Sequence, residues 1–93
     1  MNLIQHYING KIYKGSSSRK GKVFNPATGA QESEVILGTK SDLDHAVENA
    51  KTAFEKWSQV TPLQRARVIF KYKELIEKNY DDLTKLIVSE HGK

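Results

Sequence analysis

Three histidines are the side chains of this sequence best suited to metal binding or proton transfer, and they are widely spaced: His6, His45 and His91. No two of them stand four residues apart, the spacing that places two metal ligands on one helix face. We expect His6 on the surface of a strand and His45 on the surface of a helix. His91 comes at the end of a predicted helix, where the dipole favours a cation. None of the three is predicted to be catalytic.

Two pairs of carboxylates stand close together in the sequence, Asp42 with Asp44 and Asp81 with Asp82. Each pair is predicted in the first turn of a helix, where the dipole stabilises acidic side chains. General acid–base catalysis would require burial or a pocket that shifts a pKa, and nothing in the pattern indicates either. Trp57 falls on the apolar face of its predicted helix, which favours packing over ligand stacking.

The stretch from Gly15 to Gly21 is the nearest approach to a phosphate-binding loop. It is one residue too long for a P-loop, and Val23 follows Lys22 where that loop has serine or threonine. A flexible loop is the better interpretation. The sequence contains no G-x-G-x-x-G dinucleotide fingerprint. It also contains no cysteine, which excludes disulfides and a cysteine nucleophile and suits a reducing compartment.

The charge balance is mildly basic, with 15 Lys and Arg against 11 Asp and Glu, a net charge of +4. Acidic and basic residues alternate along the predicted helices, and only residues 19–22 form a short basic cluster, so a solvated surface is favoured over a nucleic-acid partner.

No apolar run approaches the roughly 20 residues that span a bilayer. The first residues lack a secretory signal. We therefore expect a cytoplasmic protein that binds neither membrane nor nucleic acid; a basic nucleic-acid-binding domain stays as the weakest alternative.

Residues 1–40 are predicted to form β-hairpins. Asn9-Gly10 is a strong signal for a type I′ hairpin turn, which needs a positive φ at both central positions. Pro26 and Gly29 predict a second turn. The expected strands cover residues 6–8, 11–13, 22–24 and 34–37, and Gly38 ends the last one.

Residues 41–93 are predicted to form two or three amphipathic helices. Ser41 is expected to cap the first, with Asp44 at position N3, and its apolar residues recur at spacings of three and one up to Trp57. Thr61 caps the second, with Pro62 at N1 and a capping box completed by Gln64. Asn79, with Asp82 three residues on, is the expected cap of the third segment, and Gly92 ends it.

These elements predict an α+β architecture whose helices expose apolar stripes. Two short hairpins cover such stripes only partly, so an exposed apolar patch is expected. The patch indicates that residues 1–93 are the leading piece of a larger protein. We expect this piece to self-associate when it is alone. A self-standing interaction module, which uses the patch to bind a partner or itself, is the alternative.

The order of the motifs resembles the N-terminal region of the aldehyde dehydrogenase superfamily. The likeness rests on the hairpin at residues 8–11, the Phe-Asn-Pro-Ala-Thr-Gly turn at 24–29, the helix from Ala46 to Trp57, Arg65 in the second helix and Gly92-Lys93. It covers essentially all 93 residues. The resemblance implies that residues 1–93 are one N-terminal segment of a dehydrogenase with an α/β fold.

Within the superfamily, residues 65–73 and 89–93 are most similar to the CoA-acylating methylmalonate-semialdehyde dehydrogenases, although those more often have Phe where Tyr72 stands. This likeness implies an NAD-dependent enzyme about five times longer, commonly a homo-tetramer, that forms a cysteine thioester and passes the acyl group to CoA. Its nucleophile, general base and nucleotide-binding segment lie beyond residue 93, so the segment alone is expected to be inactive. Another aldehyde dehydrogenase is the alternative within the family.

The resemblance also implies a monovalent cation site, because some members hold a cation near the strand before Asn-Pro and the acid before x-Gly-Lys. In this sequence those positions are the carbonyls of Val23 and Phe24 and the carboxylate of Glu90. Arg65 and Arg67 are candidates for CoA phosphates, since guanidinium pairs well with phosphate. Helix-surface packing is favoured for both. No catalytic or NAD-binding residue is carried over.

Overall fold

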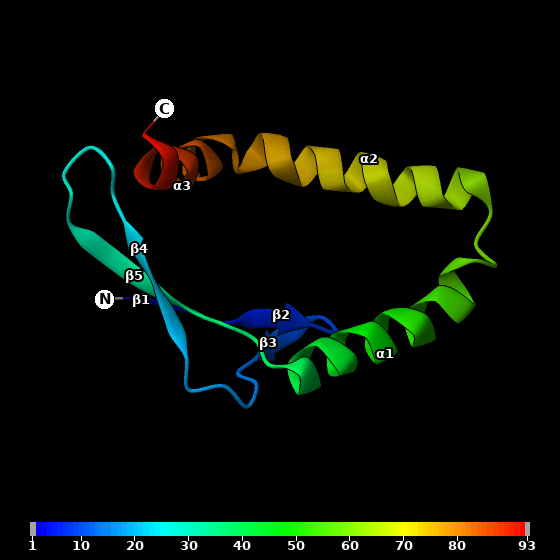
Figure 1. Cartoon of the computed structure of the whole chain (residues 1–93). Coiled ribbons are helices and arrows are strands. Elements are labelled where there is room, and N and C mark those ends of the chain that lie inside the picture. Colours follow the sequence, from blue (N-terminus) through cyan, green and yellow to red (C-terminus); the bar gives the residue numbers. More distant parts are fainter. Residues whose placement is uncertain (1, 93) are drawn as a thin grey trace.

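The chain folds into five short strands followed by three helices (Figure 1). A computed structural model describes residues 2–92; Met1 and Lys93, the second residue of the Gly-Lys pair, lie outside the described residues. The elements are β1 (Asn2–Ile4), β2 (His6–Ile8), β3 (Lys11–Tyr13), β4 (Lys20–Phe24), β5 (Gln31–Ile36), α1 (Lys40–Trp57), α2 (Pro62–Lys78) and α3 (Tyr80–His91). The strands thus precede the helices, and the α+β fold class is confirmed.

The first hairpin forms where the sequence predicted it. Strands β2 and β3 pair antiparallel, with His6 opposite Tyr13. Asn9 and Gly10 have φ angles of 55° and 73°, as a type I′ turn requires. Asn9 is the one non-glycine residue among residues 2–92 with positive φ, and asparagine tolerates that region better than most residues do.

The other strands form a three-stranded sheet in the order β1-β5-β4. Strands β4 and β5 make the second predicted hairpin, and Asn25 Oδ1 accepts a hydrogen bond of 2.9 Å from the Ala27 amide in its turn. Both strands begin earlier than predicted: β4 because Lys20 pairs with Ile36, and β5 because Gln31 pairs with Phe24. Strand β1, which pairs parallel to β5, was not predicted, since three residues are too few to show a period.

Helix α1 begins two residues earlier than expected, and the predicted cap at Ser41 is wrong. Thr39 is the N-cap: its hydroxyl accepts from the Asp42 amide at 3.1 Å, and the Asp42 carboxylate accepts from the Thr39 amide at 2.9 Å. This reciprocal pair is a capping box. It places Asp42 at N3 and moves Asp44 beyond the first turn, where it pairs with Lys40 at 2.9 Å.

Helices α2 and α3 are separated at Asn79. Thr61 caps α2 as predicted, accepting from the Gln64 amide at 3.3 Å, with Pro62 at the first position. The predicted side-chain cap at Asn79 is wrong, because its amide group donates to the Leu75 carbonyl at 2.8 Å and so completes α2 instead. The left-handed Gly92 ends α3 as expected, with φ of 79°.

The molecule is flat and its core is minimal. Its extents are 47 × 35 × 16 Å, and its radius of gyration of 16.9 Å exceeds the roughly 12 Å of a compact domain of this length. Ile36 is the one buried hydrophobic residue among those described. The predicted exposed apolar patch is confirmed: large side chains are exposed along all three helices, and Trp57, expected to pack, is 42% exposed. Within residues 2–92 no helix is long and apolar enough to cross a membrane.

Candidate functional site

The three residues predicted to hold a cation converge in the structure. Val23 and Phe24, at the end of β4, and Glu90, near the end of α3, line one pocket of about 240 Å³. The strand register shifts between Val23 and Phe24, and such an irregularity turns backbone groups out of the ladder. Glu32 of β5 lines the same pocket and adds a second carboxylate. Two acidic residues therefore line the pocket together with the two strand residues, and oxygen is the ligand type that hard cations prefer.

A second polar cluster, which sequence reasoning missed, surrounds Asp42. This residue is only 3% exposed, although no sequence pattern indicated its burial. Its carboxylate accepts hydrogen bonds from the amides of Thr39 at 2.9 Å and Ser16 at 3.1 Å. The Ser16 and Thr39 hydroxyls are themselves hydrogen-bonded at 3.1 Å. Asp42 therefore joins the start of α1 to the loop after β3, which lies 26 residues away.

Several contacts hold the pKa of Asp42 below its ordinary value of 3.8. The Thr39 amide has the largest effect, and burial, which comes second, opposes it by raising the pKa. The Ser16 amide, the Thr39 hydroxyl and the charge of His6 each lower the pKa further. Donors to the charged form stabilise it. Asp42 thus stays ionised at neutral pH, which suits a structural acceptor and does not suit a proton donor.

His6 also lies at this cluster, so the prediction of a surface position on a strand is wrong. Its side chain is 24% exposed, and Nε2 lies 3.9 Å from Asp42 Oδ2. This nitrogen is buried and makes no hydrogen bond in the described part of the chain. Both residues line a groove of about 500 Å³ between the first hairpin and α1. The chain offers no cysteine nucleophile beside this pair, so the geometry supports a junction between elements.

The remaining candidates stay apart. His45 is exposed on α1, as predicted, and stacks on Tyr13 with ring centroids 4.4 Å apart. Asp81 and Asp82 occupy the first turn of α3, as predicted, and His91 lies in its last turn. Arg67 lines a shallow depression on α2 beside other residues of that helix: Phe70, Lys71, Lys73, Glu74 and Glu77. Among residues 2–92, no three histidine or acidic side chains are grouped so that they could hold a metal ion.

The sequence matches the Aldehyde dehydrogenase family over residues 12–93. The chain belongs to this family, and the resemblance on which the sequence prediction rested is confirmed. The match extends from the first hairpin through the last helix. The open arrangement of elements is therefore that of a segment of an aldehyde dehydrogenase.

Similar proteins narrow the placement within the family. The malonate-semialdehyde dehydrogenase 1 of Shouchella clausii is 46% identical over 90 residues, which are 97% of this chain and 18% of that protein. A crystal structure of methylmalonate-semialdehyde dehydrogenase from Oceanimonas doudoroffii aligns with a TM-score of 0.93 at 40% identity. A Sinorhizobium meliloti structure assigned to the same enzyme, complexed with NAD, gives a TM-score of 0.95 at 41% identity. Each of these two alignments covers 98% of this chain and 18% of the solved structure.

Proposed function

We propose that this chain is the N-terminal scaffold segment of an NAD-dependent, CoA-acylating dehydrogenase of malonate or methylmalonate semialdehyde. The observation that carries the proposal is the 46% identity, across nearly the whole chain, to a malonate-semialdehyde dehydrogenase. The TM-score of 0.95 to a structure complexed with NAD supports the choice of cofactor. Because this chain covers only 18% of these proteins, the activity belongs to a longer polypeptide.

The proposed role of residues 1–93 is structural. The proposed chemistry oxidises the aldehyde through a cysteine-bound thioester, passes a hydride to NAD and transfers the acyl group to CoA. The segment cannot supply the nucleophile, because it has no cysteine. Each carboxylate oxygen of Asp42 accepts one backbone hydrogen bond, from Ser16 and from Thr39, which supports a structural role for this side chain.

The test is an assay of the full polypeptide that carries this segment. Purified protein is given malonate or methylmalonate semialdehyde with NAD, with and without CoA, and NADH is followed by absorbance. We expect NADH formation that depends on CoA, with an acyl-CoA product identified by mass spectrometry. A free acid formed without CoA would instead indicate another branch of the family. Residues 1–93 alone, used as the matched control, are expected to form no NADH.

The proposal includes a cytoplasmic homo-oligomer, commonly a tetramer in this family. The oligomer of the full polypeptide is inferred from the family, whereas the exposed apolar side chains of the helices bear on this segment alone, because monomeric proteins rarely leave patches this extensive in water. For the same reason we expect residues 1–93 alone to self-associate. Light scattering over a range of concentrations tests both statements, and a persistent monomer of either species would contradict the corresponding one.

We also propose that the pocket of Val23, Phe24 and Glu90 binds a monovalent cation. Its support is the convergence of the three predicted residues in one pocket. In the full polypeptide, thermal stability is expected to rise with KCl and not with choline chloride. Glu90→Gln should raise the half-maximal potassium concentration about tenfold, since changes near a metal site typically cost this much affinity. Glu77→Gln on α2 is the control, and an unchanged potassium dependence in Glu90→Gln would refute the site.

A further inference from the structure

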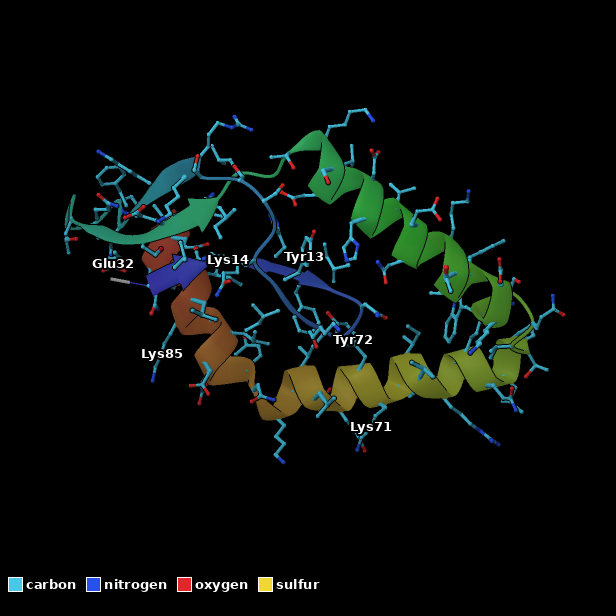
Figure 2. All side chains as sticks on the ribbon, turned by 90° about the horizontal axis from the view of Figure 1, so that it is seen from below. Tyr13, Lys14, Glu32, Lys71, Tyr72 and Lys85 are labelled. Carbon is cyan, nitrogen blue, oxygen red and sulfur yellow. The ribbon has the colours of Figure 1, made fainter. Side chains whose placement is uncertain are left out.

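Asn9 and Gly10 form the tip of the first hairpin, and both residues are exposed. In Figures 1 and 2 this tip points away from the three-stranded sheet. Tyr13, labelled in Figure 2, lies at the opposite end of the hairpin, where it pairs with His6. Water therefore has access to the tip in this segment, whereas the other end of the hairpin is joined to the rest of the fold.

The backbone amide of Gly10 is available as a nucleophile. Gly10 accepts a hydrogen bond of 3.0 Å from the Tyr7 hydroxyl through its carbonyl oxygen, and its N–H makes no hydrogen bond within residues 2–92. Gly10 has no Cβ, and a Cβ placed there would meet no atom within 4 Å. The nitrogen is therefore neither held by an acceptor nor shielded by a side chain.

The side-chain amide of Asn9 is equally unconstrained, since it makes no hydrogen bond to any residue in the described part of the chain. The asparagines that follow along the sequence each donate a side-chain hydrogen bond: Asn25, Asn49 and Asn79. Asn25 also precedes Pro26, which has no N–H. Asn49 lies inside α1, where the next backbone amide is held in the helix. Asn9 thus combines a free amide side chain with a free backbone N–H on the next residue.

We propose that Asn9 is a site of spontaneous covalent modification, at which its amide is converted to aspartate and isoaspartate. The Gly10 nitrogen attacks Cγ of Asn9, so that an N–Cγ bond forms and the Cγ–Nδ2 bond breaks. Nδ2 leaves as ammonia, taking the proton of the Gly10 N–H, and a cyclic imide remains. Water then opens the ring: addition at Cγ gives aspartate, and addition at the backbone carbonyl carbon gives isoaspartate.

The two products have different consequences for the hairpin. Aspartate keeps the ordinary backbone and is tolerated in a type I′ turn, where Asn9 and Gly10 have φ angles of 55° and 73°. Isoaspartate carries the main chain through its side-chain carbon and so lengthens the turn by one atom. Because turn type and loop length fix the register of a hairpin, the pairing of Ile8 with Lys11 beside the turn is lost in this product.

The experiment incubates the full polypeptide at mildly alkaline pH in water enriched in heavy oxygen, and peptide mass spectrometry follows each asparagine. We expect conversion of Asn9 with incorporation of one heavy oxygen atom, and no conversion of Asn25 or Asn49. Asn9→Gln is the matched control and is expected to lose the product at position 9, because its longer side chain does not close the same five-membered ring. An unmodified Asn9, or conversion of Asn49 at the same rate, would overturn the proposal.

A synthetic peptide of residues 4–15 separates the chemistry from shielding by the fold. We expect the peptide and the folded polypeptide both to be modified at Asn9. Conversion in the peptide alone would mean that the rest of the polypeptide protects the tip, and the proposal would be overturned.

Hydrogen exchange tests the consequence for the hairpin. The modified protein is separated from the unmodified protein by its added negative charge, and the isoaspartate content is measured with an isoaspartyl methyltransferase. Exchange at residues 7–12 is expected to be faster in the isoaspartyl fraction than in the aspartyl one, and equal exchange would refute the loss of register. No readout requires turnover, so an enzyme with a different substrate leaves this result intact.

Discussion

Gly15 is the position at which a single methyl group should do most damage to this segment. Its φ is +76°, and an added Cβ would lie 2.8 Å from both carboxylate oxygens of Asp42. Gly29 has nearly the same φ, +74°, but an added Cβ there meets nothing within 4 Å. The two glycines therefore separate the conformational cost of a side chain from the cost of the contact.

The expected magnitudes follow from that comparison. Alanine in the left-handed region costs roughly 1–2 kcal/mol, which both variants pay. Gly15→Ala should destabilise the fold by an additional ~1–3 kcal/mol, because its methyl group overpacks against Asp42. Asp42 cannot move away without loss, because the amides of Ser16 and Thr39 hold its carboxylate at 3.1 and 2.9 Å. We therefore expect Gly15→Ala to destabilise the segment by about 2–5 kcal/mol and Gly29→Ala by about 1–2.

The assay is hydrogen exchange by mass spectrometry on the full polypeptide, since a global unfolding curve of a multidomain protein gives no defined free energy. Gly15→Ala should accelerate exchange both in the loop at residues 14–19 and at the start of α1, residues 39–45. Gly29→Ala should affect only its own turn. Equal effects of the two variants, or an effect of Gly15→Ala confined to the loop, would refute the reasoning that Asp42 couples these segments.

Three further outcomes are expected. Thr39→Ala should weaken the first turn of α1 by about 1 kcal/mol, seen as faster amide exchange there, whereas Ser41→Ala should not, because Thr39 is the cap. The lowered pKa of Asp42 stabilises the folded state above pH 3.8, and this stabilisation is lost as the pH falls through the lower pKa of the folded state. Protection of the amides at the start of α1 should therefore stay level down to about pH 5 and fall only in stronger acid. Asp42→Asn should remove that fall. Ile36→Ala should lower the opening free energy of the sheet by about 2–5 kcal/mol in exchange measurements, because this buried residue fills the core, while an unchanged sheet would contradict its place there.

Local signals account for the parts of the fold that were predicted correctly. Asn9-Gly10 produced the expected hairpin because positive φ at both positions is a property of those two residues. Thr61-Pro62 opened α2 because the cap and the fixed φ act within one turn. The cap of α1 was misplaced by two residues because both Thr39 and Ser41 carry a hydroxyl. Only the backbone path after Gly38 decides which hydroxyl reaches the N3 amide.

The proposed cation pocket could be located from the sequence, whereas the Asp42 junction could not. Val23, Phe24 and Glu90 were identified through the family resemblance, and the structure brings them to one pocket. The burial of Asp42 had no local signal, because its partner Ser16 lies 26 residues away in the sequence. A glycine with positive φ before a serine, facing a helix cap, is the pattern that accompanies this junction here.

By itself, the sequence determined the hairpin turns, the helices and the absence of a cysteine nucleophile, because each depends on residue type and short spacing. It also carried the family, through the order of weak motifs along the whole chain. Only the tertiary structure decided that β1 joins β5 in parallel and that Asp42 is buried against the distant Ser16 amide. These features depend on contacts between segments far apart in the chain, which no local pattern of side chains specifies.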